Sequence, residues 1–89
     1  MIEREIAITN KLGLHARASA KLVQLLQGCK SEAFLVHRGR EVNAKSIMGV
    51  MMLAAGVGST ITVRVDGADE NAIMEAIADL FARKFDEAA

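Results

Sequence analysis

A histidine and an arginine two residues apart, His15 and Arg17, follow a glycine-containing loop and precede a stretch with helical spacing of apolar residues. If a helix begins at Ala16, His15 occupies its N-cap. The N–H groups of Ala16, Arg17 and Ala18 then have no partner within the helix. Free amides and the positive end of the helix dipole make this position suitable for an anion. The forked guanidinium of Arg17 adds donors that match phosphate oxygens.

The chemistry that this arrangement supports is the covalent capture of a phosphoryl group on the imidazole of His15. A positive neighbourhood disfavours imidazolium, so we expect the ring to stay neutral and nucleophilic near neutral pH. Histidine is among the side chains that form covalent intermediates. Neutral imidazole is also a good leaving group, so the phosphoryl group stays transferable. A lone histidine is more often a surface residue or a simple N-cap, and its position beside Arg17 favours the chemical interpretation.

Neither a second base that could activate water nor a set of metal ligands occurs near His15. His37 falls in a predicted strand, and Cys29, the only cysteine, has no CxxC partner. A zinc site is therefore not expected, and the chemistry requires no cofactor. We favour a carrier over a hydrolase.

Alternating strand and helix patterns position these residues. Period-two patterns predict four strands, over Ile2–Thr9, Glu32–His37, Arg40–Asn43 and Thr60–Val65. Helical spacing predicts three helices, from Ala16 to about Gln27, from Ile47 to Leu53 or Ala54, and a last one with Ile73, Ala76, Ile77, Leu80 and Phe81 on one face. The order βαββαβα predicts an α+β fold with helices on one face of a sheet. The other face meets solvent with Glu3, Glu5, Thr62 and Arg64.

A serine, Ser46, immediately precedes the second predicted helix in "AKSIMGVMML". Serine is a common N-cap. A phosphate added there would meet free amides and a favourable dipole while adding about −1.5 to −2 charge. The helix that follows carries no charge, so we expect Ile47, Met48 and Met51 to form an exposed patch beside the His15 loop; burial of the helix on all sides is the alternative. Because methionine adapts to different partners, we interpret this patch as a docking surface.

Length and composition argue against several other classes of protein. The 89 residues suit one domain, 1–89. Eleven basic residues balance eleven acidic ones, and three phenylalanines occur without Trp or Tyr, so a nucleic-acid partner is not expected. No run approaches the roughly 18 apolar residues of a membrane span, and no secretory leader precedes the first strand. With a single cysteine and no internal disulfide, we expect a soluble cytoplasmic protein that does not insert into membranes.

Two segments, "NKLGLHARASAKLV" and "VNAKSIMGVMMLAAGVGSTITV", resemble the histidine-containing phosphocarrier family HPr of the bacterial phosphoenolpyruvate-dependent phosphotransferase system. The likeness covers essentially the whole chain. It implies an open-faced β-sandwich with a four-stranded antiparallel sheet and three helices on one face. It also implies that His15 takes a phosphoryl group from phospho-enzyme I and passes it to an EIIA protein or domain, with Arg17 assisting. Such a carrier is not an enzyme, and we expect it to be a monomer.

The resemblance also concerns regulation and the branch of the family. Ser46 matches the site that HPr kinase/phosphorylase modifies in many relatives. The family usually has proline directly after the arginine, whereas this chain has Ala18, which keeps its N–H and is less preorganised for a first helical turn. The branch therefore stays open between a sugar-uptake carrier and a nitrogen-related or purely regulatory one. From other classes, the alternatives are a small acylphosphatase-like enzyme, which would not accumulate phosphohistidine, and an interaction module, which gives no reason for the His–x–Arg pair.

Overall fold

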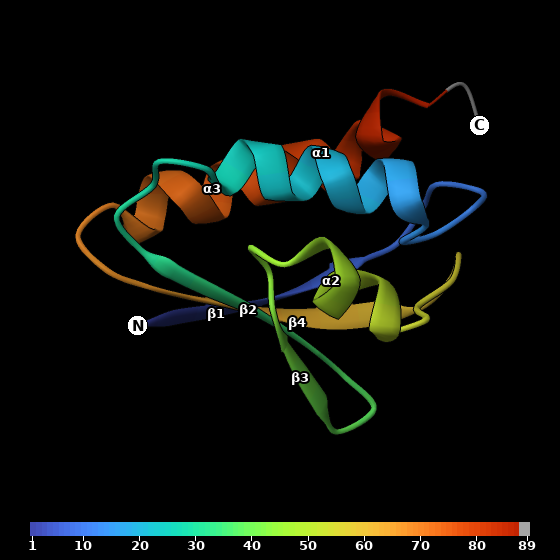
Figure 1. The fold of residues 1–89 in the computed structure, drawn as a ribbon, viewed down its shortest axis with the longest axis horizontal. Helices are drawn as coiled ribbons and strands as arrows, with labels where there is room; N and C mark the ends of the chain where they lie inside the picture. The colour runs from blue at the N-terminus through green and yellow to red at the C-terminus, as the bar shows by residue number, and fades with distance from the viewer. Residues whose placement is uncertain (88–89) are drawn as a thin grey trace.

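The computed structural model describes residues 1–87, which form an antiparallel sheet covered by helices on one face (Figure 1). The strands are β1 (Ile2–Ala7), β2 (Glu32–His37), β3 (Arg40–Asn43) and β4 (Thr60–Asp66). The helices are α1 (Ala16–Leu26), α2 (Ile47–Met52) and α3 (Glu70–Ala82), followed by a short turn η1 (Lys84–Asp86). The predicted fold class and element order are confirmed. The last two residues of the domain predicted over 1–89 lie outside the described range.

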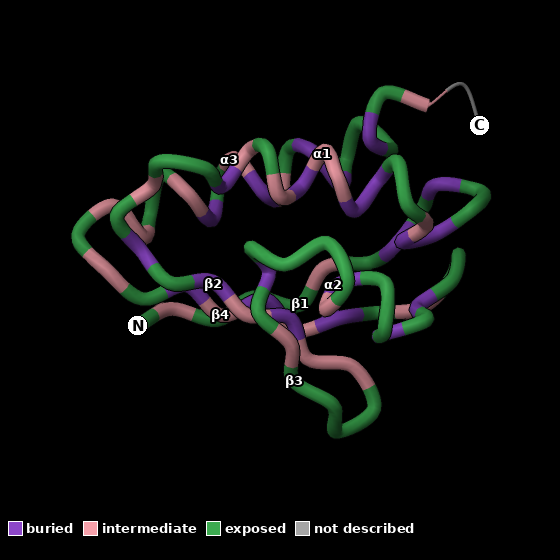
Figure 2. Tube along the Cα trace, viewed as in Figure 1, coloured by how far each residue is buried: buried purple, intermediate pink, exposed green. Residues whose placement is uncertain are grey.

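The strands lie in the order β1-β4-β2-β3, which periodicity alone does not specify. On the face under the helices, Val63 of β4 lies between Arg4 of β1 and Leu35 of β2. Buried residues are concentrated between this face and the helices (Figure 2). Arg4 interrupts the apolar pattern, and its Nη1 donates to Glu75 Oε1 of α3 at 3.0 Å. The helices complete the core with Ala18, Leu22, Leu26, Met74, Ile77, Leu80 and Phe81.

The opposite face of the sheet is open and carries the predicted polar side chains, together with Phe34 and Val36, which are half-buried and lie opposite Arg64 and Thr62. Arg64 on this face lies 2.7 Å from Glu3 Oε2 and 2.7 Å from Glu41 Oε1, through two different nitrogens. These ion pairs are largely exposed, so each contributes at most about 1 kcal/mol to stability. The open face therefore depends on the core on the other side of the sheet for its stability.

Several predicted element ends are wrong by one or two residues, for identifiable reasons. β1 ends at Ala7 and not at Thr9, because Ala7 pairs with Thr60, the first residue of β4. The end of α1 agrees with the prediction of about Gln27, because the helix ends at Leu26 with Gln27 as its C-cap, and Gly28 follows in a left-handed conformation with φ of 79°. β4 extends one residue beyond the predicted Val65, to Asp66, because Asp66 pairs with Glu32 of β2. α2 ends at Met52, one residue before the predicted Leu53.

The C-terminal part of the core contains two residues that the sequence pattern did not indicate, Met74 and Phe85. The Phe85 ring is fully buried, and its centroid lies 4.7 Å from that of Phe81 in a T-shaped arrangement. Lys84, Phe85 and Asp86 have φ values of 55°, 55° and 61°, so η1 is a left-handed turn. Residues other than glycine rarely adopt this conformation, which is why no sequence signal predicted the turn.

No helix within residues 1–87 combines the length and the apolar character that a membrane span needs.

Candidate functional site

The loop before α1 is fixed by short-range contacts that determine where His15 lies. Gly13 has φ of 66°, and its N–H donates to the carbonyl of Asn10 at 3.2 Å. The fully buried side chain of Asn10 donates from Nδ2 to the Gly13 carbonyl at 2.8 Å. The next amide, that of Leu14, donates to the carbonyl of Ala55 at 3.1 Å. These bonds hold the loop against the segment after α2 and place His15 at the start of α1.

His15 is the N-cap of α1, as predicted. Its backbone is extended, with φ of −77° and ψ of −178°, and its carbonyl accepts the first helical bond from Ser19 N at 2.9 Å. Its side chain makes no capping hydrogen bond, so the ring is not committed to the helix amides. Ala16 and Arg17 are exposed beside it, whereas Ala18 is fully buried. Burial of Ala18 narrows the predicted phosphate-binding amides to those of Ala16 and Arg17.

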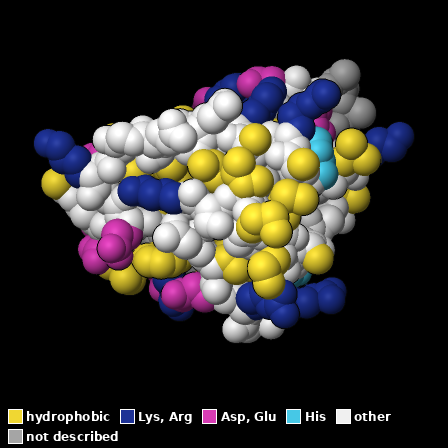
Figure 3. Space-filling view, in the orientation of Figure 1, with side chains coloured by type: hydrophobic (Ala, Val, Ile, Leu, Met, Phe, Trp, Pro, Cys, Tyr) yellow, Lys and Arg dark blue, Asp and Glu magenta, His cyan; other side chains and the backbone are white. Residues whose placement is uncertain are grey.

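A shallow depression surrounds the ring of His15, whose side chain is 27% exposed. It is lined by Lys11, Leu12, His15, Ala16, Arg17, Lys21, Asp86 and Glu87. The structure therefore brings His15 and Arg17 to one surface, and it adds acidic residues from the distant C-terminal segment. In Figure 3 a histidine side chain lies at the surface beside basic and hydrophobic groups. Cationic and apolar groups around a half-exposed imidazole suit both an anion and a protein partner.

The residue at this site that sequence reasoning missed is Glu87. Its Oε2 lies 2.5 Å from His15 Nε2, and its Oε1 accepts from Asn10 Nδ2 at 3.2 Å. Desolvation raises the pKa of this carboxyl, but the hydrogen bonds from His15 and Asn10 and the charges of His15 and Arg17 outweigh it and lower the pKa below its ordinary value. The expectation for the His15 ring, which was based on the sequence alone, did not include this carboxylate. No local pattern could have indicated a partner 72 residues away.

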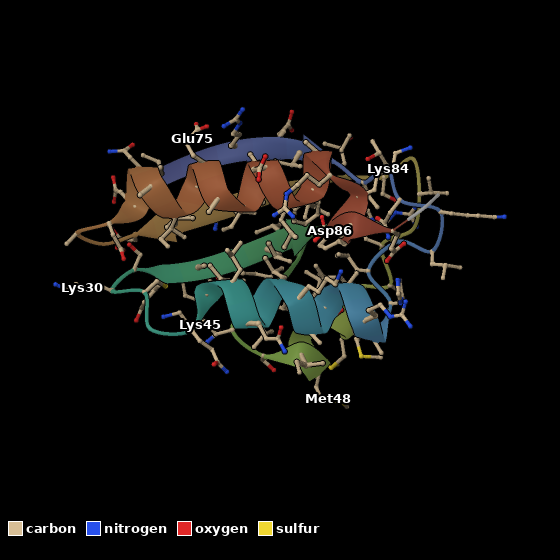
Figure 4. The ribbon with its side chains drawn as sticks, turned by 90° about the horizontal axis from the view of Figure 1, so that it is seen from above. Lys30, Lys45, Met48, Glu75, Lys84 and Asp86 are labelled. Carbon is tan, nitrogen blue, oxygen red and sulfur yellow. The ribbon has the colours of Figure 1, made fainter. Side chains whose placement is uncertain are left out.

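The turn that carries Glu87 is attached to α1 and α3 by charged side chains. Lys21 Nζ donates to the carbonyl of Phe85 at 2.7 Å and lies 3.7 Å from Asp86 Oδ2. Arg83 Nη1 donates to both oxygens of Asp86, at 2.7 and 3.0 Å. Lys84 and Asp86 accordingly lie at the end of α3, near the start of α1 (Figure 4). The ammonium group of Lys21 is thus engaged by Phe85 and Asp86 of the C-terminal segment.

The second predicted site lies at α2. Ser46 Oγ accepts a hydrogen bond from Gly49 N at 3.1 Å, which confirms it as the N-cap. Only Val50 of this helix is buried, so burial of α2 on all sides is wrong. Ile47, Met48 and Met51 are exposed, and Met52, which the prediction did not include, is 58% exposed. These four residues are called the apolar patch below; Met48 points outward in Figure 4.

Comparison with known proteins gives consistent matches. A family model described as "PTS HPr component phosphorylation site" matches residues 2–83. The chain is 58% identical over 87 residues to a phosphocarrier protein HPr from Xylella fastidiosa, covering 98% of each chain. It is 43% identical over 88 residues to a phosphocarrier protein NPr from Shewanella violacea, covering 99% of this chain and 97% of the relative. Among solved structures, HPr-C-His from Thermoanaerobacter tengcongensis matches with a TM-score of 0.95 and 39% identity, covering 100% of both chains.

Proposed function

The chain belongs to the HPr family of phosphocarrier proteins of the phosphotransferase system, and we propose that it accepts a phosphoryl group from phospho-enzyme I on His15 and passes it to an EIIA protein or domain. Members of this family are carriers and not enzymes, which removes the acylphosphatase-like alternative. The observation that carries the proposal is the position of His15, at the mouth of α1 with a half-exposed ring that makes no capping bond.

The proposed transfer is a displacement at phosphorus. A lone pair on the His15 ring forms the new N–P bond as the bond to the donor breaks, and the leaving electron pair stays with the donor. The amides of Ala16 and Arg17 and the Arg17 guanidinium receive the phosphoryl oxygens. The helix dipole stabilises such a charge by roughly 0.3–1 kcal/mol at an exposed site. This modest stabilisation suits a carrier, because the group must leave again for the acceptor.

Incubation with phosphoenolpyruvate and enzyme I tests the proposal. One phosphoryl group, labile in acid and stable in base, is expected on the parent and absent from His15→Ala. Acid-labile uptake by His15→Ala would contradict the assignment. Arg17→Lys retains the charge and loses the forked geometry. It should lower the transfer rate by roughly tenfold, the effect of one charge-assisted hydrogen bond of about 1.4 kcal/mol.

Regulation through Ser46 and docking through the apolar patch complete the proposal. Phosphorylation of Ser46 by an HPr kinase/phosphorylase would place about −1.5 to −2 charge at the N-terminus of α2. The adjoining Ile47 and Met48 are 42% and 69% exposed, so the added charge would lie at the edge of the apolar patch. A partner that buries this patch would then have to desolvate the phosphate. We expect Ser46→Asp to weaken transfer while the fold stays cooperative, and equal transfer rates for this variant and the parent would remove the regulatory role.

The chain is 58% identical to the HPr from Xylella fastidiosa and 43% identical to the NPr from Shewanella violacea, and we propose on this ground an HPr-type carrier that serves a sugar-type EIIA. Transfer to a sugar-type EIIA and to a nitrogen-type EIIA, measured side by side, tests this choice. Preferred transfer to the nitrogen-type EIIA would overturn it. We further propose that the carrier acts as a cytoplasmic monomer, and the monomeric state is tested by sedimentation at the concentrations used in the transfer assay.

A further inference from the structure

The contact between Glu87 and His15 suggests a second role at the same site. We propose that Glu87 is a positioning residue that keeps a hydrogen on Nε2 of His15 and so presents the lone pair of Nδ1 to the incoming phosphoryl group. This inference rests on the proposed function, since it concerns the residue that orients the acceptor ring. Glu87 acts through His15 and is not itself expected to touch the phosphoryl group.

The assignment of the hydrogen follows from the chemistry of the two partners. An ionised carboxylate only accepts hydrogen bonds, and a neutral imidazole has one N–H and one lone pair. Because Glu87 Oε2 lies 2.5 Å from Nε2, Nε2 must be the nitrogen that carries the hydrogen. The lone pair of the neutral ring therefore lies on Nδ1. The lowered pKa of Glu87 keeps the carboxylate ionised at neutral pH.

The contact is built into the fold and does not depend on a loose surface side chain. The Glu87 side chain is only 12% exposed, and its second oxygen accepts from Asn10 Nδ2. Asn10 is fully buried, and its same nitrogen also donates to the Gly13 carbonyl in the loop before His15. Asn10 therefore orients Glu87, and Glu87 orients the ring.

The backbone before Glu87 is strained in a way that serves this placement. Three consecutive non-glycine residues, from Lys84 to Asp86, have positive φ. Such conformations persist only where surrounding contacts impose them, and they are concentrated at functional sites. Here the contacts are burial of the Phe85 ring and the bond from Lys21 Nζ to the Phe85 carbonyl. The turn directs the next side chain, Glu87, back toward α1.

Glu87 also has a defined effect on the transfer step. When Nδ1 forms the N–P bond and the donor bond breaks, the hydrogen stays on Nε2 and the ring acquires positive charge. The carboxylate stabilises this charge through the hydrogen bond that it already makes, as carboxylates do for other reacting histidines. Lys11, Arg17, Lys21 and Asp86 also line the depression. Lys21 pairs with Asp86 and also donates to the Phe85 carbonyl. Glu87 is therefore the carboxylate that contacts the His15 ring.

This role is not contained in the family assignment. The matched segment ends at residue 83, so Glu87 lies beyond it. The family match therefore supports His15 as part of the phosphorylation site without specifying what binds Nε2. That partner comes from the tertiary structure of this chain.

Nitrogen NMR of the unphosphorylated protein tests the assignment without any transfer partner. The ring-nitrogen shifts of His15 at a pH where the ring is neutral should show the hydrogen predominantly on Nε2 in the parent. Glu87→Gln keeps an oxygen that can accept from Nε2 and should retain part of this preference, whereas Glu87→Ala should lose it. The matched control is Glu75→Gln, because Glu75 is exposed on α3, paired with Arg4, and lies away from η1 (Figure 4). This control should leave the His15 spectrum unchanged.

The transfer assay gives the second readout. Phosphoryl uptake from phospho-enzyme I should be about tenfold slower in Glu87→Ala than in the parent, the loss expected for one charge-assisted hydrogen bond. Glu87→Gln should fall between them, and the phosphoryl group of the parent should be on Nδ1. A parent that shows the hydrogen on Nε2 but takes up no phosphoryl group would refute the proposed function alone. Identical tautomer ratios in parent and Glu87→Ala, both folded by circular dichroism, would overturn the role of Glu87 even if transfer proceeds.

Discussion

Replacing Gly13 with alanine should destabilise the protein strongly, because the loop before His15 has no room for a side chain. A Cβ at this position would lie 2.6 Å from the Ala55 carbonyl oxygen and 2.8 Å from Gly56 Cα. Both are backbone atoms, so relief requires movement of the loop, at roughly 1–3 kcal/mol. The positive φ of 66° adds roughly 1–2 kcal/mol for alanine. Alanine also makes the unfolded chain less flexible, which offsets about 0.4–1 kcal/mol of this cost and leaves a net loss of about 1–5 kcal/mol, centred near 3 kcal/mol.

Gly28→Ala is the matched control for this prediction. Gly28 also has a positive φ, 79°, but a Cβ there would meet nothing within 4 Å. It should therefore show the conformational cost alone, about 1 kcal/mol after the unfolded-state correction. Urea unfolding at neutral pH measures both variants against the parent. For a domain of this size each 1 kcal/mol lowers the melting temperature by roughly 4–8 °C, so a central loss of about 3 kcal/mol should make Gly13→Ala melt roughly 12–24 °C below the parent.

The comparison of the two variants can refute the steric reasoning directly. If Gly13→Ala loses no more stability than Gly28→Ala, the close approach to Ala55 does not contribute to the loss of stability.

The close packing of the loop also has a functional consequence. Because the amide of Leu14 bonds to the Ala55 carbonyl, movement of the loop displaces His15 from the start of α1. Transfer by Gly13→Ala should therefore be slower than by Gly28→Ala under conditions in which both are folded.

Three further predictions concern single side chains. Ser46→Ala removes the acceptor for Gly49 N and should lower the free energy of unfolding by about 1 kcal/mol in urea; an unchanged midpoint would show that the cap is not stabilising. Met48→Asp, at a position that is 69% exposed, should change stability by less than about 0.5 kcal/mol and yet slow phosphoryl transfer, so an unaffected rate would exclude Met48 from docking. The folded-state pKa of Glu87 lies below its ordinary value of 4.5, so its stabilising contribution is complete above that pH and is lost as the pH falls through the lower, folded pKa. The stability advantage of the parent over Glu87→Gln should accordingly shrink between pH 7 and pH 3 in urea, and an equal difference at both values would contradict the pairing.

The residues around α1 show which features of the site a local sequence pattern can predict and which it cannot. The N-cap at His15 and the exposed Arg17 could be predicted because helix starts depend on the identity and spacing of a few neighbouring residues. The same holds for Ser46, whose capping bond spans three positions. The accessibility of the Ala18 amide could not be predicted in this way, because its burial results from the packing of α1 over the sheet. The inclusion of Met52 in the apolar patch could not be predicted either, because it depends on which side of α2 packs against the core.

The sequence by itself determined the class of fold, the order of its elements, and a histidine and an arginine at a helix mouth, because periodicity, caps and glycines act over short stretches of chain. Only the tertiary structure decided the strand order β1-β4-β2-β3 and the partner of His15. Both depend on contacts between distant segments. Glu87 reaches His15 across 72 residues, through a left-handed turn that burial of Phe85 holds in place. Such a contact depends on the packed core as a whole, and no local sequence pattern records it.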